Sequence, residues 1–294
     1  MVTDVAIVGV PTDFGVDRRG VDMGPSAIRY AELESRLARA DVAPVDTGDV
    51  DVSAPGQQHH WTSIRGMWDV LAQRIAEQRR SGAIPLVLGG DHSISIGTLR
   101  GLADAGSIGI LWFDAHGDFN TPETSTTGNV HGMPLALATG TGAFSTDAVA
   151  QALTVRPDRT ALVGVRSLDD PEATALRNSP VSAFTMADID EAGMAAVVRE
   201  AIDHISRDVD VVLVSLDLDV LDPIEAPGVG TPVRGGITYR EAHLAMELVG
   251  TNLTEAGLLG AMELVEVNPI RDRLNETGEL AAELAASAFG DRII

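Results

Sequence analysis

The chain has 294 residues, 45% of them hydrophobic, which is enough to bury a sizeable aliphatic core. It contains no cysteine, and this excludes disulfides, thiolate metal ligands and a cysteine nucleophile. Its formal net charge is −22 and all 21 basic residues are arginine, so the composition argues against binding to nucleic acid and is compatible with a small cationic substrate.

In the first half of the chain, short apolar runs rich in β-branched residues predict strands. They lie at residues 5–10, 42–45, 83–88 and 108–113, and the run at 42–45 is the weakest. Pro25 suits the first turn of a helix that we expect to continue to about Leu37. An acidic loop is expected at 46–51, and apolar residues at helical spacing predict a second helix at 61–80.

The second half begins with a long polar loop at 120–132 and continues the alternation of strands and helices. Further strands are expected at 160–165, 181–184, 211–216 and 260–267. Helices fit between most of these, notably at 194–205, 239–248 and 276–288. This alternation indicates a parallel sheet covered by helices on both faces. Because no repeat or linker divides the chain, we expect one α/β domain over residues 1–294 with eight strands.

The sequence shows no sign of insertion into a membrane or of export. No apolar run is as long as a membrane-spanning helix. Asp4 lies where a secretion signal would carry positive charge. We therefore expect a cytoplasmic protein without a membrane partner.

Acidic residues and histidines follow four of the predicted strands, at the point where each strand ends. These are Asp91 and His92, then Asp114, His116 and Asp118, then Asp217, Asp219 and Asp222, and finally Glu266. Ligands of open parallel sheets bind beyond the carboxyl ends of the strands, so we expect these side chains to lie together. An isolated Asp-x-His-x-Asp is more often a solvated strand end. Four such groups at one rim are unfavourable without cations, and they favour a metal site.

The segment after residue 113 has to curl if it holds metal. A straight strand would separate Asp114 from Asp118 by about 13 Å, whereas paired ions lie ~3.5–4 Å apart. We expect the curl at Gly117, which tolerates unusual backbone angles. Two histidines and four aspartates form an oxygen-rich donor set that suits Mn²⁺ better than a structural zinc. Six side chains can hold two ions only if carboxylates bridge them, and bridged ions acidify a shared water.

Three separated motifs resemble the ureohydrolase family, which comprises arginases, agmatinases and related guanidino hydrolases. They are Gly-Gly-Asp-His92-Ser, Asp114-Ala-His116-Gly-Asp118 and Ser215-Leu-Asp217-Leu-Asp219-Val-Leu-Asp-Pro. The resemblance extends from Arg19 to Pro269 and implies a three-layer α/β/α domain with an eight-stranded parallel sheet. It implies two Mn²⁺ per subunit, one bound by His92, Asp114, Asp118 and Asp217, the other by Asp114, His116, Asp217 and Asp219. It also implies a homo-oligomer, either a trimer or a hexamer.

Within this family, the loop at 118–132 resembles that of arginases rather than agmatinases. The resemblance implies that the α-carboxylate and α-amino groups of L-arginine contact four residues of the loop, namely Asn120, Ser125, Thr127 and Asn129. Hydroxyls and amides suit a zwitterion because they can orient both charges. A second matching segment implies that Asp169 and Glu172 face the α-amino group, although its Ser167 and Asp170 depart from the better-known arginases. Thr231 matches a further position of the substrate pocket.

Two residues match the catalytic groups of the family. Glu266 matches the carboxylate that pairs with the guanidinium, for which a bidentate contact is geometrically apt. His131 matches the proton-shuttle histidine, and imidazole titrates in the useful range. The resemblance implies an arginase, in which a metal-bridging hydroxide attacks the guanidinium carbon and Asp118 passes its proton toward the leaving amine. The alternatives are an agmatinase or another guanidino-acid hydrolase, or a non-catalytic metal-binding member of the family.

Overall fold

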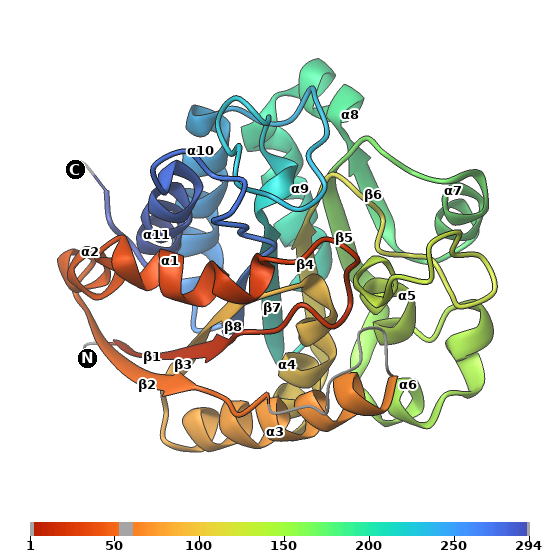
Figure 1. The fold of residues 1–294 in the computed structure, drawn as a ribbon, viewed down its shortest axis with the longest axis horizontal. Helices are drawn as coiled ribbons and strands as arrows, with labels where there is room; N and C mark the ends of the chain where they lie inside the picture. Colours follow the sequence, from red (N-terminus) through yellow and green to blue (C-terminus); the bar gives the residue numbers. More distant parts are fainter. Residues whose placement is uncertain (1–2, 53–60, 293–294) are drawn as a thin grey trace.

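The computed structural model describes residues 3–52 and 61–292. Within them, eight parallel strands form one sheet in the order β2-β1-β3-β8-β7-β4-β5-β6, with helices on both faces (Figure 1). The strands are β1 (Thr3–Val10), β2 (Val42–Asp49), β3 (Ile84–Gly89), β4 (Ile108–Phe113), β5 (Val155–Val165), β6 (Ser182–Thr185), β7 (Val211–Asp217) and β8 (Leu259–Val265). This arrangement confirms the predicted three-layer α/β/α fold class.

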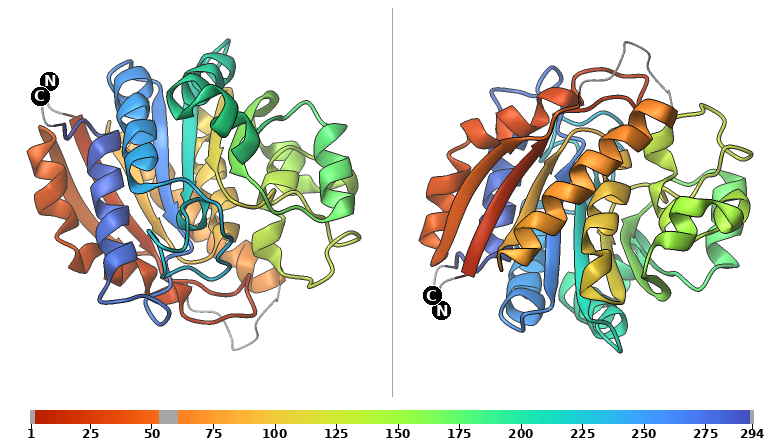
Figure 2. Two further views of the ribbon diagram at one scale, coloured as in Figure 1. Left: turned by 90° about the horizontal axis from the view of Figure 1, so that it is seen from above. Right: turned by 90° about the horizontal axis from the view of Figure 1, so that it is seen from below.

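The helices separate into two layers, which Figure 2 shows from opposite sides. One layer contains α1 (Gly24–Tyr30), α2 (Leu33–Arg39), α9 (Met194–Ile205), α10 (Tyr239–Val249) and α11 (Glu276–Ala288). The other contains α3 (Trp61–Arg80) and α4 (Ser95–Leu102). The other α-helices of the described residues are α5 (Pro134–Ala138), α6 (Ala148–Ala152), α7 (Asp170–Arg177) and α8 (Met186–Ala192). No helix of the described ranges is both long and apolar enough to cross a membrane.

Burial on both faces explains why the central strands are continuously apolar. In β4, Leu111 and Phe113 join the core under α9, α10 and α11, whereas Ile110 and Trp112 join the core under α3 and α4. Successive side chains of a strand point to opposite faces, so every position of a doubly covered strand lies in a core. All four of these side chains are fully buried.

The structure corrects several predicted element boundaries. The helix expected from residue 25 to Leu37 is broken at Glu32, whose φ of 58° is left-handed, so that α1 and α2 form instead. The acidic loop expected at 46–51 is largely strand, because β2 continues to Asp49. As an edge strand it can keep polar residues, and Arg29 pairs with both Asp46 and Asp49 at 2.6 Å. Similarly, β5 begins earlier than expected, at Val155.

Strand order decides where the polar groups meet. The four strands that precede the polar clusters are β3, β8, β7 and β4, and these are consecutive neighbours at the centre of the sheet. Because β8 ends at Val265, two residues before the predicted end, Glu266 lies just beyond the strand. The carboxyl ends of the four central strands therefore form a single rim on which all the clusters converge.

Candidate metal centre

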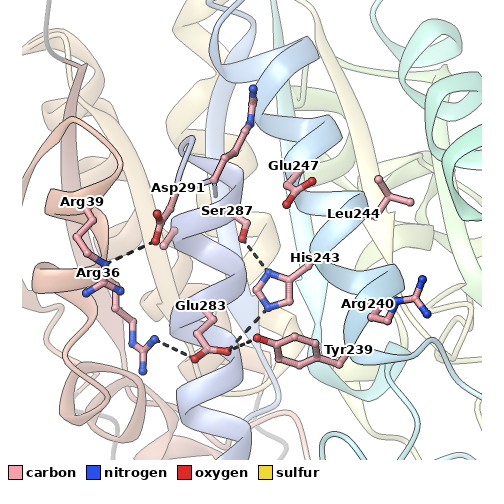
Figure 3. A pocket seen from close by; sticks show the side chains of 12 residues that line it. Arg36, Arg39, Tyr239, Arg240, His243, Leu244, Glu247, Glu283, Ser287 and Asp291 are labelled. Carbon is pink, nitrogen blue, oxygen red and sulfur yellow. Dashed lines mark hydrogen bonds and ion pairs between the residues drawn. The ribbon is translucent and has the colours of Figure 1, made fainter. Parts of the chain in front are cut away.

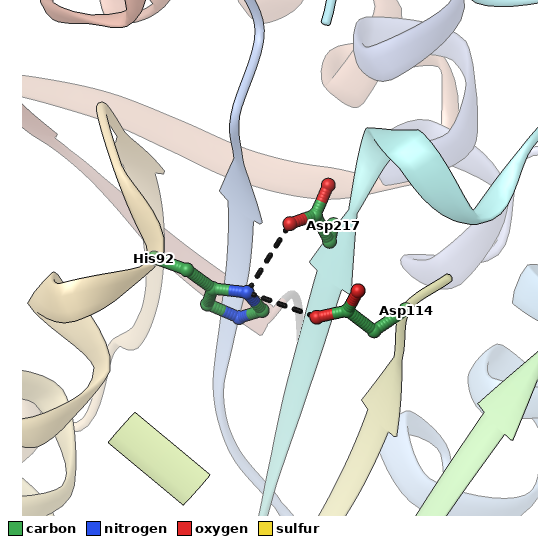
Figure 4. A group of neighbouring side chains, drawn as sticks. All are labelled: His92, Asp114 and Asp217. Carbon is green, nitrogen blue, oxygen red and sulfur yellow. Dashed lines mark ion pairs between the residues drawn. The ribbon is translucent and has the colours of Figure 1, made fainter. Parts of the chain in front are cut away.

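Three carboxylates surround one nitrogen of His92. The ring follows β3, and its Nδ1 lies 3.0 Å from Asp118 Oδ2 and 3.3 Å from the Oδ2 atoms of both Asp114 and Asp217. Figure 4 shows the imidazole pointing between the carboxylates of Asp114 and Asp217, which come from β4 and β7. All four side chains are buried. The arrangement brings together the four predicted ligands of the first ion.

A second cluster adjoins the first through Asp114. His116 Nδ1 lies 2.9 Å from Asp219 Oδ2 and 3.5 Å from Asp114 Oδ1. Asp114 thus presents one oxygen to each histidine, as a bridging carboxylate would. Groups of side chains that could hold a cation are His92 with Asp114 and Asp217, and Asp114 with His116 and Asp219. The predicted bridging role of Asp217 stays a prediction.

The protonation properties of these residues fit a site for cations. Burial disfavours an imidazolium, yet the neighbouring carboxylates of Asp114, Asp118 and Asp217 raise the pKa of His92 well above its ordinary value. Burial and the charge of Asp114 raise the pKa of Asp118 to about 7. Among the described residues, buried His92 Nδ1 and Asp118 Oδ2 have no hydrogen-bond partner. Divalent cations between these atoms would satisfy both and neutralise the acids.

The chain curls after β4, but not where the sequence predicted. The left-handed residue is Asp118, with φ 48°, rather than Gly117. Gly117 is required for space instead, because a Cβ there would lie 2.7 Å from Leu168 Cδ2 and 2.8 Å from Glu172 Cδ. A non-glycine residue in the left-handed region costs about 1–2 kcal/mol. This strained backbone conformation turns the Asp118 carboxylate back toward His92, and contacts elsewhere in the fold offset its cost.

Hydrogen bonds from a backbone amide, a threonine hydroxyl and a half-buried arginine hold the second cluster in place. Asp219 accepts hydrogen bonds from the Ala115 amide at 3.1 Å and from Thr231 Oγ1 at 3.1 Å. The guanidinium of Arg166 donates to the carbonyls of Asp219 at 2.8 Å and Val233 at 2.7 Å, and so ties the loop after β7 to the loop that carries Thr231. In the sequence, Arg166 directly precedes the segment that carries Asp169 and Glu172, and nothing there indicated that it holds these loops together.

Glu266 and His131 form a pair beside the metal cluster. Glu266 Oε1 accepts a hydrogen bond from the His92 amide at 3.0 Å and lies 3.0 Å from His131 Nδ1. Burial opposes the charged form of His131, but the carboxylate of Glu266 outweighs it and raises the pKa of His131 to about 9. Glu266 Oε2 is buried without a hydrogen-bond partner among the described residues. That oxygen remains available to a donor from a ligand.

A cavity of about 140 Å³ opens onto this cluster. It is lined by predicted metal ligands, predicted substrate contacts, the predicted catalytic His131 and two further residues, Gly132 and Ser167. The full lining is His116, Asp118, Asn120, His131, Gly132, Ser167, Asp169, Glu172, Asp217, Asp219 and Thr231. Four predicted substrate residues are not among its lining residues, namely Ser125, Thr127, Asn129 and Glu266. The Ser125 and Thr127 hydroxyls accept hydrogen bonds from the amides of Gly128 and Asn129, at 3.0 and 3.2 Å. The structure therefore brings together only part of the predicted substrate pocket.

Glu172 also serves the local fold. Its Oε1 accepts from the Phe119 amide at 2.9 Å, and its Oε2 accepts from the Asp169 amide at 3.3 Å, at the start of α7. Asn120 Nδ2 lies 3.4 Å from Asp169 Oδ2 across the mouth of the cavity. Glu172 thus joins the loop after β4 to α7, and its predicted contact with an α-amino group stays a prediction.

A larger cavity, of about 490 Å³, lies between α2, α10 and α11 (Figure 3). Two ion pairs join charged groups of its lining, Arg36 with Glu283 at 2.9 Å and Arg39 with Asp291 at 3.8 Å. The His243 ring lies 2.9 Å from Ser287 Oγ through Nδ1. Because these charges are already matched, this cavity lacks the concentration of unneutralised acids that marks the strand rim.

We expect Mn²⁺ binding to release protons. In the metal-free protein, Asp118 titrates near pH 7, and the carboxylates of Asp219 and Asp114 overcome burial to raise the pKa of His116 to about 12. A cation has to displace these protons, so the apparent affinity should rise from pH 6 to pH 8. Calorimetric titration in two buffers of different ionisation enthalpy measures the release. An affinity independent of pH, with no protons released, would contradict this account of the site.

The chain is similar to known arginases in both sequence and fold. The family model described as "Arginase family" matches residues 3–290. A curated arginase of Bacillus subtilis is 45% identical over 99% of both chains. The solved arginase of Bacillus caldovelox has a TM-score of 0.91 and 43% identity, covering 99% of this chain and 100% of that one. An Entamoeba histolytica arginase, solved in complex with L-ornithine, has a TM-score of 0.87 and 30% identity, covering 99% and 100%. The chain belongs to the arginase family.

Proposed function

We propose that this protein is an arginase, a hydrolase that converts L-arginine and water to L-ornithine and urea. The observation that carries the proposal is the joined pair of histidine–aspartate clusters beside a small cavity that also reaches His131, Asn120 and Thr231. The relatives named above are arginases, and one was solved with L-ornithine. This support favours arginase over agmatinase.

We assign the cofactor as two Mn²⁺ ions, held by the predicted ligands His92, Asp114, His116, Asp118, Asp217 and Asp219. Oxygen-rich donor sets of this kind suit manganese. When bound, the ions supply Lewis acidity that lowers the pKa of water and makes hydroxide available near neutral pH. The expectation of a homo-oligomer, as a trimer or hexamer, stays a prediction.

The remaining residues bind the guanidinium and move protons. Glu266 is anchored through Oε1 to the His92 amide, so it offers Oε2 to a guanidinium N–H. A charge-assisted hydrogen bond at that oxygen would orient the substrate carbon toward the cluster. Asp118 lines the cavity beside the cluster, so its carboxylate can take a proton and pass it toward the leaving amine. His131 borders the cavity and can exchange that proton with solvent.

The direct test is an assay of urea and ornithine released from L-arginine by the purified chain with added MnCl₂. We expect both products in equal amounts, and we expect activity to be lost after chelation and restored by Mn²⁺. A protein that binds the ions but releases no urea would be the non-catalytic member of the family that the sequence left open.

A further inference from the structure

Glu263 is a fully buried acid to which neither the sequence motifs nor the proposed reaction gives a role. It lies on β8, and the sheet register places it beside Ser215 of β7, which in turn lies beside Trp112 of β4. These three side chains form a row across adjacent strands on the α3 and α4 side of the sheet. The imidazole of His92 contacts the row, stacking on Trp112 with a centroid distance of 4.0 Å.

Hydrogen bonds run along this row in one direction. Ser215 Oγ donates to Glu263 Oε2 at 3.0 Å, and Ser95 Oγ donates to the same oxygen at 2.7 Å. His92 Nε2 lies 2.8 Å from Ser215 Oγ. A serine hydroxyl has a single proton, and here Glu263 accepts it. The hydroxyl oxygen can then only accept from His92, so Nε2 carries hydrogen.

This direction fixes the tautomer of the metal ligand. With hydrogen on Nε2, a neutral His92 presents the lone pair of Nδ1 to the carboxylates of Asp114, Asp118 and Asp217, which lie 3.0 to 3.3 Å away. A lone pair facing three carboxylates is unfavourable in the absence of a cation and is suited to binding one. The opposite tautomer would place a hydrogen in the middle of the ion site.

We propose that Glu263 is a positioning residue that acts through Ser215 to hold His92 in the tautomer that binds the first metal ion. The inference rests on the proposed dinuclear site. It does not depend on the ionisation of Glu263, because Oε2 accepts both serine protons even when the other oxygen is protonated. Partners of this kind typically change metal affinity by about 10–100-fold.

The test compares three substitutions by calorimetric titration of the metal-free chain with Mn²⁺ alone. Glu263→Met removes the acceptor and keeps the volume, so Ser215 can donate to His92, and affinity at the His92 cluster should fall about 10–100-fold. Glu263→Gln keeps an acceptor oxygen and should retain the affinity. Ser95→Ala removes the other hydroxyl at Oε2 without touching His92, and it too should bind as the wild type does.

A double-mutant cycle provides the decisive measurement. If Glu263 acts through Ser215, the Ser215→Ala/Glu263→Met double variant should lose no more affinity than Ser215→Ala alone. Additive losses would overturn the proposal, as would wild-type affinity in Glu263→Met, equal losses in the Gln and Met variants, or an equal loss in Ser95→Ala. Thermal melting of each metal-free variant checks that it is folded, and Ser215→Ala serves alone if Glu263→Met is not. A wild-type chain that fails to bind two ions would refute the dinuclear site rather than the positioning role.

Discussion

Asp217→Ala is expected to lower urea release from L-arginine by about 10³-fold or more. In the proposed site this residue is a ligand of both ions, and its loss weakens two charge-stabilising contacts at once. Such contacts contribute several kcal/mol to the transition state, and each ~1.4 kcal/mol corresponds to a tenfold change in rate. Steady-state assays at saturating Mn²⁺, together with metal analysis of the dialysed protein, measure the effect.

The same variant should remain folded. Burial and the charges of Asp219 and Asp114 raise the pKa of Asp217 well above its ordinary value, so the ionised side chain destabilises the metal-free fold at neutral pH. The thermal midpoint without metal should therefore equal or exceed that of the wild type, while added Mn²⁺ should raise it less. Normal turnover with two bound ions would show that Asp217 is not a shared ligand.

Asp222→Asn is the matched control for this experiment. Asp222 follows the same strand, but its carboxylate accepts hydrogen bonds from the Ile224 amide at 3.0 Å and the Gly235 amide at 2.8 Å, away from the histidines. The amide oxygen of asparagine can replace at least one of these acceptors. We expect activity within a few-fold of the wild type.

The fold class could be predicted because strands that are buried on both faces of a sheet consist of nearly continuous runs of apolar residues. β4 and β7 are wholly buried and mostly apolar, and aspartates lie at or just after their carboxyl ends. Edge strands gave weaker signals, since β2 mixes exposed and half-buried residues and was predicted only in its first half. Strand order was out of reach, because β8 pairs with β3 and β7 pairs with β4, and the strands of each pair lie far apart in the sequence.

The residues of the two histidine–aspartate clusters were identifiable by residue type and spacing, but the contacts that orient them were not. Asp118 and Glu266 both adopt positive φ, at 48° and 66°, where glycine would ordinarily be expected. Only the surrounding packing decides that such strain is tolerated. Likewise Arg166 and Glu263 act through partners more than 45 residues away in the chain, at Asp219 and Ser215. No short sequence pattern indicates a contact between residues so far apart in the chain.

Agmatine is expected to be a poor substrate, with a kcat/KM lower than that of L-arginine by about 10⁴-fold. A site built to hydrogen-bond a polar substituent rejects the analogue that lacks it, because the site's own polar groups are left without partners. Agmatine carries the guanidinium but no α-carboxylate. Asn129 carries such an unpaired polar group when no substrate is bound, because its Oδ1 is buried with no hydrogen-bond partner among the described residues. Initial rates of urea release from both compounds give the ratio.

Single substitutions in the loop locate the source of that ratio. Ser125→Ala and Thr127→Ala should lower kcat/KM for L-arginine and leave the low value for agmatine unchanged, because only arginine offers the groups that these hydroxyls would bind. Thr126→Ala is the matched control, since this exposed residue lies between them and was not predicted to touch substrate. Neither hydroxyl borders the cavity in this structure, so an unchanged kcat/KM for L-arginine in both variants would show that the loop does not contact substrate. Comparable efficiency on agmatine and arginine would refute arginase specificity and leave the family assignment intact.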